Sequence, residues 1–251
     1  MPLVDRNGVT FHTQRLGEAG PPLVMLHGLV VGSLASWYFT SAPPLAKSHR
    51  VLLFDLRGHG LSSRPATGYG VRSMAQDLAA LLEEFGDEPV RLVGHSFGAL
   101  VALRFALDHP GRVTKLALVE APLPPSRLGE VAAFLGRPAA ELTSSLPAPL
   151  QAALGAGKRQ ALRFVEQVRA LGQTSLPADL EAERDVPDEE LGRLDAEVRC
   201  FYGTASAVLP VGERLAAVIP GASLRTLPGG HYLPLEAPAE LTAGLVEFLD
   251  G

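Results

Sequence analysis

Residues 90–101 read Val-Arg-Leu-Val-Gly-His-Ser-Phe-Gly-Ala-Leu-Val, which contains the pattern Gly-x-Ser-x-Gly at 94–98. The branched aliphatic residues at 90–93 predict a short buried strand, and the apolar stretch at 99–107 predicts a helix. A serine on a sharp strand-to-helix turn carries its hydroxyl above the edge of the sheet, and the flanking glycines leave room for the bend. Ser96 is therefore a candidate nucleophile. A glycine-serine turn without chemistry is the alternative.

The length and composition of the chain are those of a globular protein with a large core. Of its 251 residues 47% are hydrophobic, which fits one large α/β domain as easily as two small ones, and we favour one core with one insertion that acts on a small molecule. The net charge is -5 and the basic residues are scattered, so we expect neither nucleic acid nor membrane as a partner. The N-terminus lacks a signal-peptide pattern, and we expect a cytoplasmic monomer or homodimer. The single cysteine, Cys200, is expected to be a buried, inert thiol.

Strand-like and helix-like stretches alternate along most of the chain. Strands are expected at 9–15, 22–27, 50–54, 90–93, 113–119, 198–202 and 223–227, and helices at 71–85, 97–107, 211–218 and 239–249. This alternation predicts an α/β fold with a mostly parallel, doubly wound sheet that binds ligands at the carboxyl ends of its strands. Ser96, His27 and Asp55 fall at such ends.

One segment, residues 122–196, interrupts this alternation. It contains alanine- and leucine-rich helical pieces separated by prolines, and it has no convincing strand. We interpret it as a helical cap inserted after the strand that ends near Glu120. The core would then comprise residues 1–121 and 197–251, and some apolar side chains of the cap, such as Phe134 and Leu135, would roof a pocket.

Four motifs follow predicted strands. They are His-Gly at 27–28, Asp-Leu-Arg-Gly-His-Gly-Leu-Ser at 55–62, Gly-His-Ser-Phe-Gly at 94–98 and Gly-Gly-His-Tyr-Leu-Pro-Leu-Glu-Ala-Pro at 229–238. In these motifs and their order the chain resembles the α/β-hydrolase fold family over nearly its whole length. The resemblance implies that fold with a helical cap, and a catalytic pair of Ser96 and His231. It also implies that the amides of Leu29 and Phe97 form the oxyanion hole, with both side chains lining the acyl site.

His231 has the chemistry that a serine nucleophile needs. A serine hydroxyl reacts poorly at neutral pH without a base whose pKa lies near the working pH, and histidine supplies one. His27 and His95 are not expected to act as this base. The spacing of the histidines and the single cysteine matches no metal-binding motif, so we expect neither a metal nor a cofactor.

The third catalytic residue departs from the usual family pattern. Most relatives carry an aspartate in Gly-x-x-Asp after the penultimate strand, whereas this chain has Ser206 at that position. A carboxylate is needed to orient the histidine and to stabilise its protonated form. Glu120, at the end of the strand 113–119, is our candidate for it, although a charged residue that merely starts the cap is the alternative.

The leading functional hypothesis is a serine hydrolase that cleaves a carboxylic ester or thioester of a fairly apolar small molecule through an acyl-enzyme. The expected catalytic residues are Ser96, His231 and Glu120, and the substrate-binding residues are Leu29, Trp37, Phe97, Phe134 and Leu135. The same residues could serve a C–C bond hydrolase, a perhydrolase or an acyl transferase or cyclase. A protein that binds a ligand on this fold without catalysis is the alternative of another class.

Overall fold

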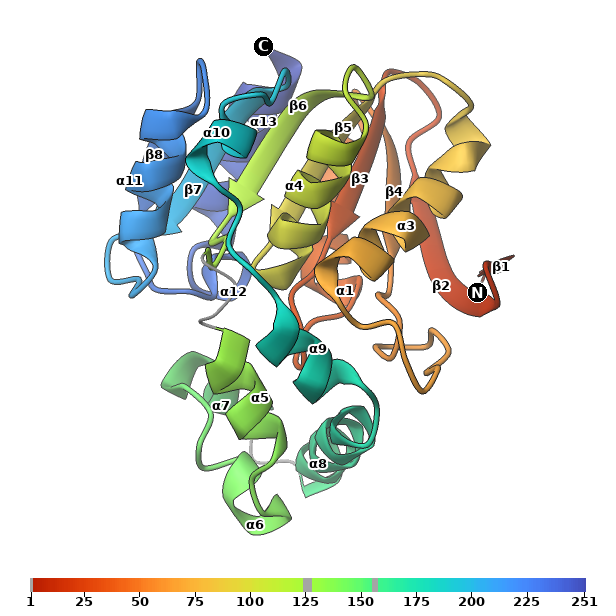
Figure 1. Cartoon of the computed structure of the whole chain (residues 1–251), viewed down its shortest axis with the longest axis vertical. Coiled ribbons are helices and arrows are strands. Elements are labelled where there is room, and N and C mark those ends of the chain that lie inside the picture. The colour runs from red at the N-terminus through yellow and green to blue at the C-terminus, as the bar shows by residue number, and fades with distance from the viewer. Residues whose placement is uncertain (1, 124–127, 155–157) are drawn as a thin grey trace.

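The computed structural model describes residues 2–123, 128–154 and 158–251. Its centre is an eight-stranded sheet in the order β1-β2-β4-β3-β5-β6-β7-β8 (Figure 1). The strands are β1 (Leu3–Arg6), β2 (Val9–Leu16), β3 (Pro22–Leu26), β4 (Arg50–Phe54), β5 (Val90–His95), β6 (Val113–Val119), β7 (Glu197–Gly203) and β8 (Ser223–Leu227). Neighbours from β4 to β8 pair in parallel, whereas β2 pairs antiparallel with both β1 and β4. The predicted doubly wound, mostly parallel sheet is confirmed.

Helices cover both faces of this sheet. Figure 1 shows α3 (Val71–Leu82), α4 (Phe97–Asp108) and α11 (Leu209–Val218) in front of the sheet and α13 (Pro238–Asp250) behind it. Successive residues of a strand point to opposite faces of the sheet. In β3, Val24 and Leu26 therefore belong to the apolar cluster that contains residues of α3 and α4. Leu23 and Met25 pack in the cluster with α13. β3 is apolar throughout because neither of its faces meets water.

The register of the parallel strands brings their carboxyl ends to one edge. His95 of β5 pairs with Val119 of β6, and Val119 pairs with Phe201 of β7. The residues that follow β5 and β6, Ser96 and Glu120, therefore leave the sheet at the same level. This edge is where the loops carrying chemical groups meet.

The inserted segment forms a helical lobe beyond that edge, at the bottom of Figure 1. It contains α5 (Gly129–Leu135), α6 (Ala139–Leu142), α7 (Ala148–Leu154), α8 (Lys158–Gly172) and α9 (Leu176–Ala182). Two acidic side chains that follow α8 in the sequence connect this lobe to the loop before α3. Asp179 accepts the amide hydrogen of Tyr69 at 2.7 Å, and Glu183 accepts that of Val71 at 2.6 Å. Glu183 thereby caps α3, whose own N-cap residue, Gly70, has no side chain to do so.

The last part of the insertion returns to the core. In Figure 1, α10 (Asp188–Leu191) lies beside the upper part of the sheet, away from the lobe of α5–α8. Arg104 of α4 donates a hydrogen bond to Glu190 at 2.7 Å, and Arg214 of α11 pairs with Asp185 at 3.0 Å and with Asp188 at 2.7 Å. These ion pairs hold residues 185–190 against the core helices.

Several short elements were not expected from the sequence. They are β1, which pairs with β2 and forms the edge of the sheet, and the short helices α1 (Ala35–Tyr38), α2 (Ala42–Leu45) and α12 (Leu233–Glu236). The helix predicted at 71–85 ends at Leu82 and continues as a tighter 3-10 turn, η1 (Glu83–Phe85). Such one-turn elements are too short to show a hydrophobic period in the sequence.

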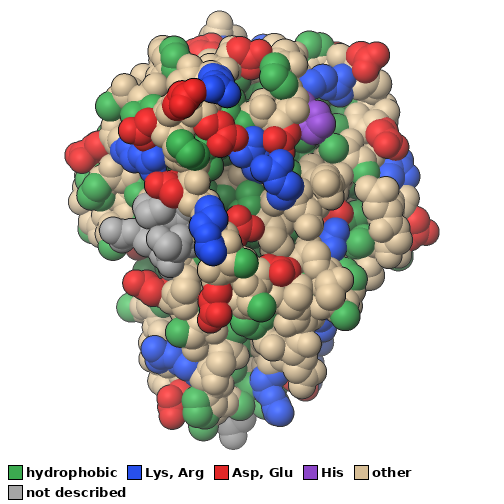
Figure 2. Space-filling model, in the orientation of Figure 1, with side chains coloured by type: hydrophobic (Ala, Val, Ile, Leu, Met, Phe, Trp, Pro, Cys, Tyr) green, Lys and Arg blue, Asp and Glu red, His purple; other side chains and the backbone are tan. Residues whose placement is uncertain are grey.

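The molecular surface mixes charges of both signs. On the face shown in Figure 2, Lys and Arg side chains alternate with Asp and Glu side chains over both the core and the lobe. No helix in residues 2–123, 128–154 and 158–251 combines the length and the apolar character that crossing a bilayer would require.

Candidate active site

Ser96 occupies a strained corner between β5 and α4. Its backbone has φ +53° and ψ -121°, a conformation that a non-glycine residue adopts only where the surrounding structure holds it. Gly94 and Gly98 make this corner possible. A Cβ on Gly94 would lie 2.5 Å from the backbone of Ala99, and one on Gly98 would lie 2.5 Å from the His27 carbonyl oxygen. Both glycines are needed because backbone approaches closely on each side of the serine.

His231 meets Ser96 from the loop after β8. The distance from its Nε2 to Ser96 Oγ is 2.8 Å, so Nε2 accepts the serine hydroxyl. This loop passes close to the end of β7 because residue 203 is a glycine, where a Cβ would lie 2.3 Å from the carbonyl oxygen of Gly229. His95 supports the loop by donating from Nε2 to the carbonyl oxygen of His231 at 2.8 Å. The predicted pair of serine and imidazole thus lies within hydrogen-bonding distance.

Glu120 lies on the other side of the His231 ring. Its Oε2 is 3.1 Å from His231 Nδ1, and its side chain is fully buried. The backbone of Glu120 has φ +54°, and its amide donates to the Phe201 carbonyl oxygen at 2.9 Å. Because a carboxylate only accepts hydrogen bonds, Nδ1 carries the ring proton and Nε2 presents its lone pair to Ser96. This is the tautomer that general-base catalysis requires.

Ser206, which stands where the resemblance led us to expect an aspartate, holds the carboxylate. Its hydroxyl donates to Glu120 Oε2 at 2.5 Å, and the Gly203 amide donates to Oε1 at 2.5 Å. A buried carboxylate needs such partners because burial without them is costly. A serine at 206 can donate to a glutamate that reaches across from β6, as the hydrogen bond between Ser206 and Glu120 shows.

Two other histidines brace the loop that follows β3. His27 donates from Nδ1 to the Gly28 carbonyl oxygen at 2.8 Å, and its Nε2 accepts the Leu56 amide at 3.0 Å. His59 accepts the Val30 amide at Nε2, at 2.9 Å. Burial lowers the pKa of His27 and lowers that of His59 to about 3. These rings are fixed, neutral struts and are not available as a base.

The buried histidines predict a loss of stability in acid. Burial, with a smaller effect of His231, lowers the pKa of His95 from 6.5 to about 3, and His59 behaves alike. Between these values the unfolded chain binds more protons, so the free energy of unfolding falls as the pH drops from 6.5 towards 3. Each ring contributes about 1.4 kcal/mol per pH unit. Urea unfolding at several pH values should show that the free energy of unfolding falls less steeply with decreasing pH in His95→Asn than in the wild type.

If His95→Asn keeps the wild-type dependence of unfolding free energy on pH, the ring of His95 does not remain neutral in the folded protein.

Leu29 and Phe97 lie on either side of the nucleophile. Phe97 is the first residue of α4, where a backbone amide has no acceptor within its own helix. The loop carrying Leu29 passes close to the serine, because a Cβ on Gly28 would lie 3.2 Å from the Cβ of Ser96. Both residues line the cavity above Ser96, where the resemblance placed the oxyanion hole.

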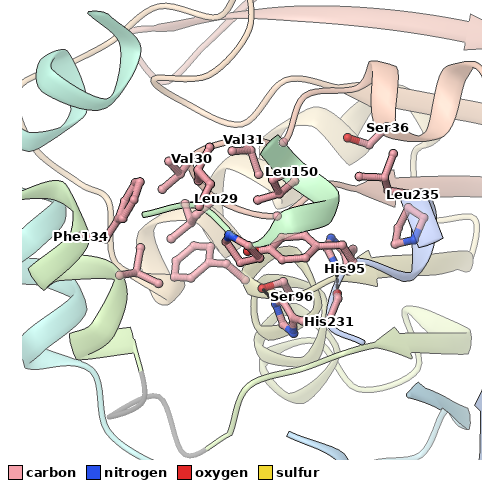
Figure 3. Close-up of a pocket in the computed structure, with 18 of the residues that line it drawn as sticks. Leu29, Val30, Val31, Ser36, His95, Ser96, Phe134, Leu150, His231 and Leu235 are labelled. Atoms are coloured by element: carbon pink, nitrogen blue, oxygen red, sulfur yellow. Dashed lines mark hydrogen bonds between the residues drawn. The ribbon is translucent and has the colours of Figure 1, made fainter. Parts of the chain in front are cut away.

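A cavity of about 530 Å³ opens above Ser96 between the core and the helical lobe of α5–α9, which we call the cap (Figure 3). Its walls are largely apolar. The core contributes Leu29, Val30, Val31, Phe97 and Leu235, and the cap contributes Leu128, Val131, Phe134, Leu146 and Leu150. The polar groups besides Ser96 and His231 include Ser36, Thr40 and the exposed Glu130. The site is suited to an apolar small molecule with one reactive polar group.

Two of the residues expected to bind substrate lie elsewhere. Trp37 is fully buried on the other side of α1, where it packs in the cluster with α13 and donates from Nε1 to the Leu26 carbonyl oxygen at 3.0 Å. Its neighbours Ala35 and Ser36 line the cavity instead. Leu135 is buried in the apolar core that the cap shares with the helices in front of the sheet, outside the cavity wall. Helix geometry turns both side chains away from the neighbours that do reach the cavity.

Comparison with known proteins agrees with this site and fold. Residues 21–140 match the family described as alpha/beta hydrolase fold. Epoxide hydrolase A of Mycobacterium tuberculosis is 30% identical over 313 aligned positions, which cover 99% of this chain and 97% of that protein. The chain belongs to the α/β-hydrolase family. In its structure this α/β hydrolase is similar to a hydrolase from Pseudomonas aeruginosa PA01, with a TM-score of 0.81, 26% identity, and coverage of 100% of this chain and 98% of that one.

An esterase is also among the similar structures. Esterase RhEst1 from Rhodococcus sp. ECU1013 has a TM-score of 0.80 and 25% identity, and the match covers 99% of this α/β hydrolase and 98% of that chain. The relatives therefore include proteins named for different reactions on one fold. The reaction of this α/β hydrolase must be inferred from its own site.

Some contacts of this α/β hydrolase were not predicted from its sequence. We expected that His95 would not act as the base. Its hydrogen bond to the His231 backbone was not predicted. The role of Ser206 as a donor to Glu120 was also missed, although its place in Gly-x-x-Ser was the available signal. In the described part of the chain, no group of three or more His, Cys, Asp and Glu side chains is arranged to hold a metal ion.

Proposed function

We propose that this α/β hydrolase cleaves a carboxylic ester or thioester through an acyl-enzyme intermediate. The observation that carries the proposal is the hydrogen-bonded series from Ser96 Oγ to His231 Nε2, at 2.8 Å, and from His231 Nδ1 to Glu120 Oε2, at 3.1 Å. The likeness to an esterase structure supports it.

The reaction would proceed in two halves. Ser96 Oγ attacks the substrate carbonyl carbon while its proton passes to His231 Nε2, and Glu120 stabilises the resulting imidazolium. The amides of Leu29 and Phe97 bind the oxygen that becomes negative. His231 then returns the proton to the leaving alcohol or thiol, which departs. A water molecule, deprotonated by His231, attacks the acyl carbon and releases the acid and Ser96.

The shape of the cavity suggests how an ester would lie. The leaving oxygen must receive its proton from His231, so the alcohol part belongs on the side of Tyr232, Pro234 and Leu235. The acyl part then extends over Leu29 towards Phe134 of the cap. In Figure 3, Phe134 and Leu235 lie at opposite sides of the cavity with Ser96 between them. We therefore propose an apolar acyl group of moderate length.

Ser96 itself favours ester cleavage over epoxide or halide displacement. When a carboxylate displaces a leaving group from an alkyl carbon it forms an ester, which water can hydrolyse. A serine would form an ether, which His231 and water could not cleave under the same conditions. The activity in the name of the relative epoxide hydrolase A is therefore not proposed for this chain.

A substrate panel tests this proposal. p-Nitrophenyl acetate, hexanoate and dodecanoate should be hydrolysed with the highest kcat/KM for hexanoate, because the acyl side of the cavity is apolar and bounded by the cap. Styrene oxide, fluoroacetate and a ring-cleavage diketone serve as the competing substrates. Turnover of any of these at a higher kcat/KM than all three esters would contradict the proposal.

A further inference from the structure

One side chain of the cap reaches the loop beside the nucleophile. Gln167, in α8, donates from Nε2 to the carbonyl oxygen of Val30 at 2.8 Å. Because a backbone carbonyl only accepts, the amide nitrogen of Gln167 must face it. Among the described side chains of α8, Gln167 is the one that hydrogen-bonds to the core.

The residue that Gln167 holds is strained. Val30 has φ +68°, in the left-handed region that a β-branched residue rarely adopts. The Val31 amide donates to the Leu29 carbonyl oxygen at 2.8 Å across this residue, which makes a tight three-residue turn. Turns of this kind with positive φ are rare and strained, and they persist only where the surroundings hold them.

Most of the backbone groups of this turn make hydrogen bonds. The amide of Val30 donates to His59 and that of Val31 to Leu29, while the carbonyl of Val30 accepts from Gln167. The amide of Leu29 has no acceptor among the described residues. A free backbone amide beside a nucleophile is suited to bind a developing negative charge.

We infer that Gln167 is a positioning residue that keeps the turn at Val30 in place and so fixes the Leu29 amide for the oxyanion. This inference rests on the proposed function, because it gives the Leu29 amide its task. The core clamps the turn through His59, and the cap clamps it through Gln167. The cap would thus contribute to transition-state binding as well as roofing the cavity.

Loss of Gln167 should leave the cap attached. Asp179 and Glu183 bind the loop before α3 independently of α8, and Ser175 donates its amide to the Ala66 carbonyl oxygen at 2.8 Å. A variant at 167 is therefore expected to alter the turn at Val30 while the fold of the cap remains.

The test compares Gln167→Leu with Gln160→Leu, which makes the same change at an exposed position of the same helix. For p-nitrophenyl hexanoate, Gln167→Leu should lower kcat roughly tenfold to a hundredfold with little change in KM, because displacing a group by about 1 Å has effects of that size. Gln167→Glu should lower it further, because a carboxylate oxygen would face the carbonyl of Val30. Gln160→Leu should match the wild type.

A transition-state analogue separates positioning from a general loss of structure. A hexyl trifluoromethyl ketone serves as this analogue. Ser96 Oγ adds to the carbonyl carbon of the ketone, the serine proton passes to His231, and the ketone oxygen becomes the oxyanion. The affinity of Gln167→Leu for the ketone should fall by the same factor as kcat. Its affinity for hexanoate, the product acid, should stay at the wild-type value.

The outcomes distinguish the two proposals. Wild-type protein that neither hydrolyses the ester nor binds the ketone would overturn the proposed function, and this inference with it. Active wild-type protein whose kcat and ketone affinity are unchanged in Gln167→Leu and Gln167→Glu would overturn the role of Gln167 alone. Equal weakening of the ketone and of hexanoate would show that Gln167 shapes the cavity and does not position the oxyanion turn.

Discussion

Glu120→Gln is expected to lower kcat for ester hydrolysis by about 10³- to 10⁴-fold, with little change in KM. The neutral amide cannot stabilise the positive imidazolium that forms when His231 takes the proton of Ser96. Its NH2 group also donates, so it favours the His231 tautomer with the proton on the wrong nitrogen. Steady-state kinetics with p-nitrophenyl hexanoate give both constants.

Asp195→Asn is the matched control for this change. Asp195 is another acidic residue near the end of the insertion; it accepts the Gly111 amide at 2.8 Å and lies outside the cavity. Its substitution should leave kcat within about twofold of the wild type. Equal losses of kcat in the two variants would show that Glu120 is not the carboxylate that orients His231 and stabilises its protonated form.

Ser96→Ala should have the largest effect on turnover, a loss of about 10⁶-fold in kcat. The nucleophile is then absent, and the backbone amides and the cavity remain as the only source of catalysis. Binding of hexanoate should be retained, because the apolar walls are unchanged. Ser36→Ala removes another serine hydroxyl from the same cavity and should change kcat by less than about threefold. Residual ester hydrolysis near the wild-type rate in Ser96→Ala would mean that another group attacks the substrate.

The strands and the two candidate residues Ser96 and His231 could be identified from the sequence because their signals are local. Three predicted strands, Arg50–Phe54, Val113–Val119 and Ser223–Leu227, match β4, β6 and β8 residue for residue. Glycines at fixed spacing marked the corner at Ser96, since only glycine tolerates backbone at 2.5 Å. Glu120 could be proposed because it ends a strand, and the parallel pairing of β5 with β6 sets such residues level with one another.

The walls of the cavity could not be predicted in the same way. Trp37 and Ser36 are neighbours in a one-turn helix, and only tertiary packing decides which of them faces the cavity. The same holds for Phe134 and Leu135 in α5. The contact between Gln167 and Val30 joins residues 137 positions apart, and nothing in the local sequence of either indicates it. Sequence periodicity identifies the buried side of a helix but does not identify what it is buried against.

Ser206 and Glu120 together place a carboxylate beside His231 in a way that differs from the usual family pattern. A family member with an aspartate after β7 reaches the histidine from that strand, whereas here the acid comes from β6 and the residue after β7 donates to it at 2.5 Å. The imidazole keeps its orientation because a carboxylate still faces Nδ1. The site thus retains its charge arrangement while the supplying strand changes.

Covalent capture of the serine tests the central claim most directly. The wild-type protein should react with a fluorophosphonate in a one-to-one ratio, and peptide mass spectrometry should place the phosphonyl group on Ser96. Ser96→Ala should show no labelling, and Glu120→Gln should be labelled far more slowly than the wild type. Folded wild-type protein that remains unlabelled, or that carries the label on another residue, would contradict the account and favour a protein that binds a ligand without catalysis.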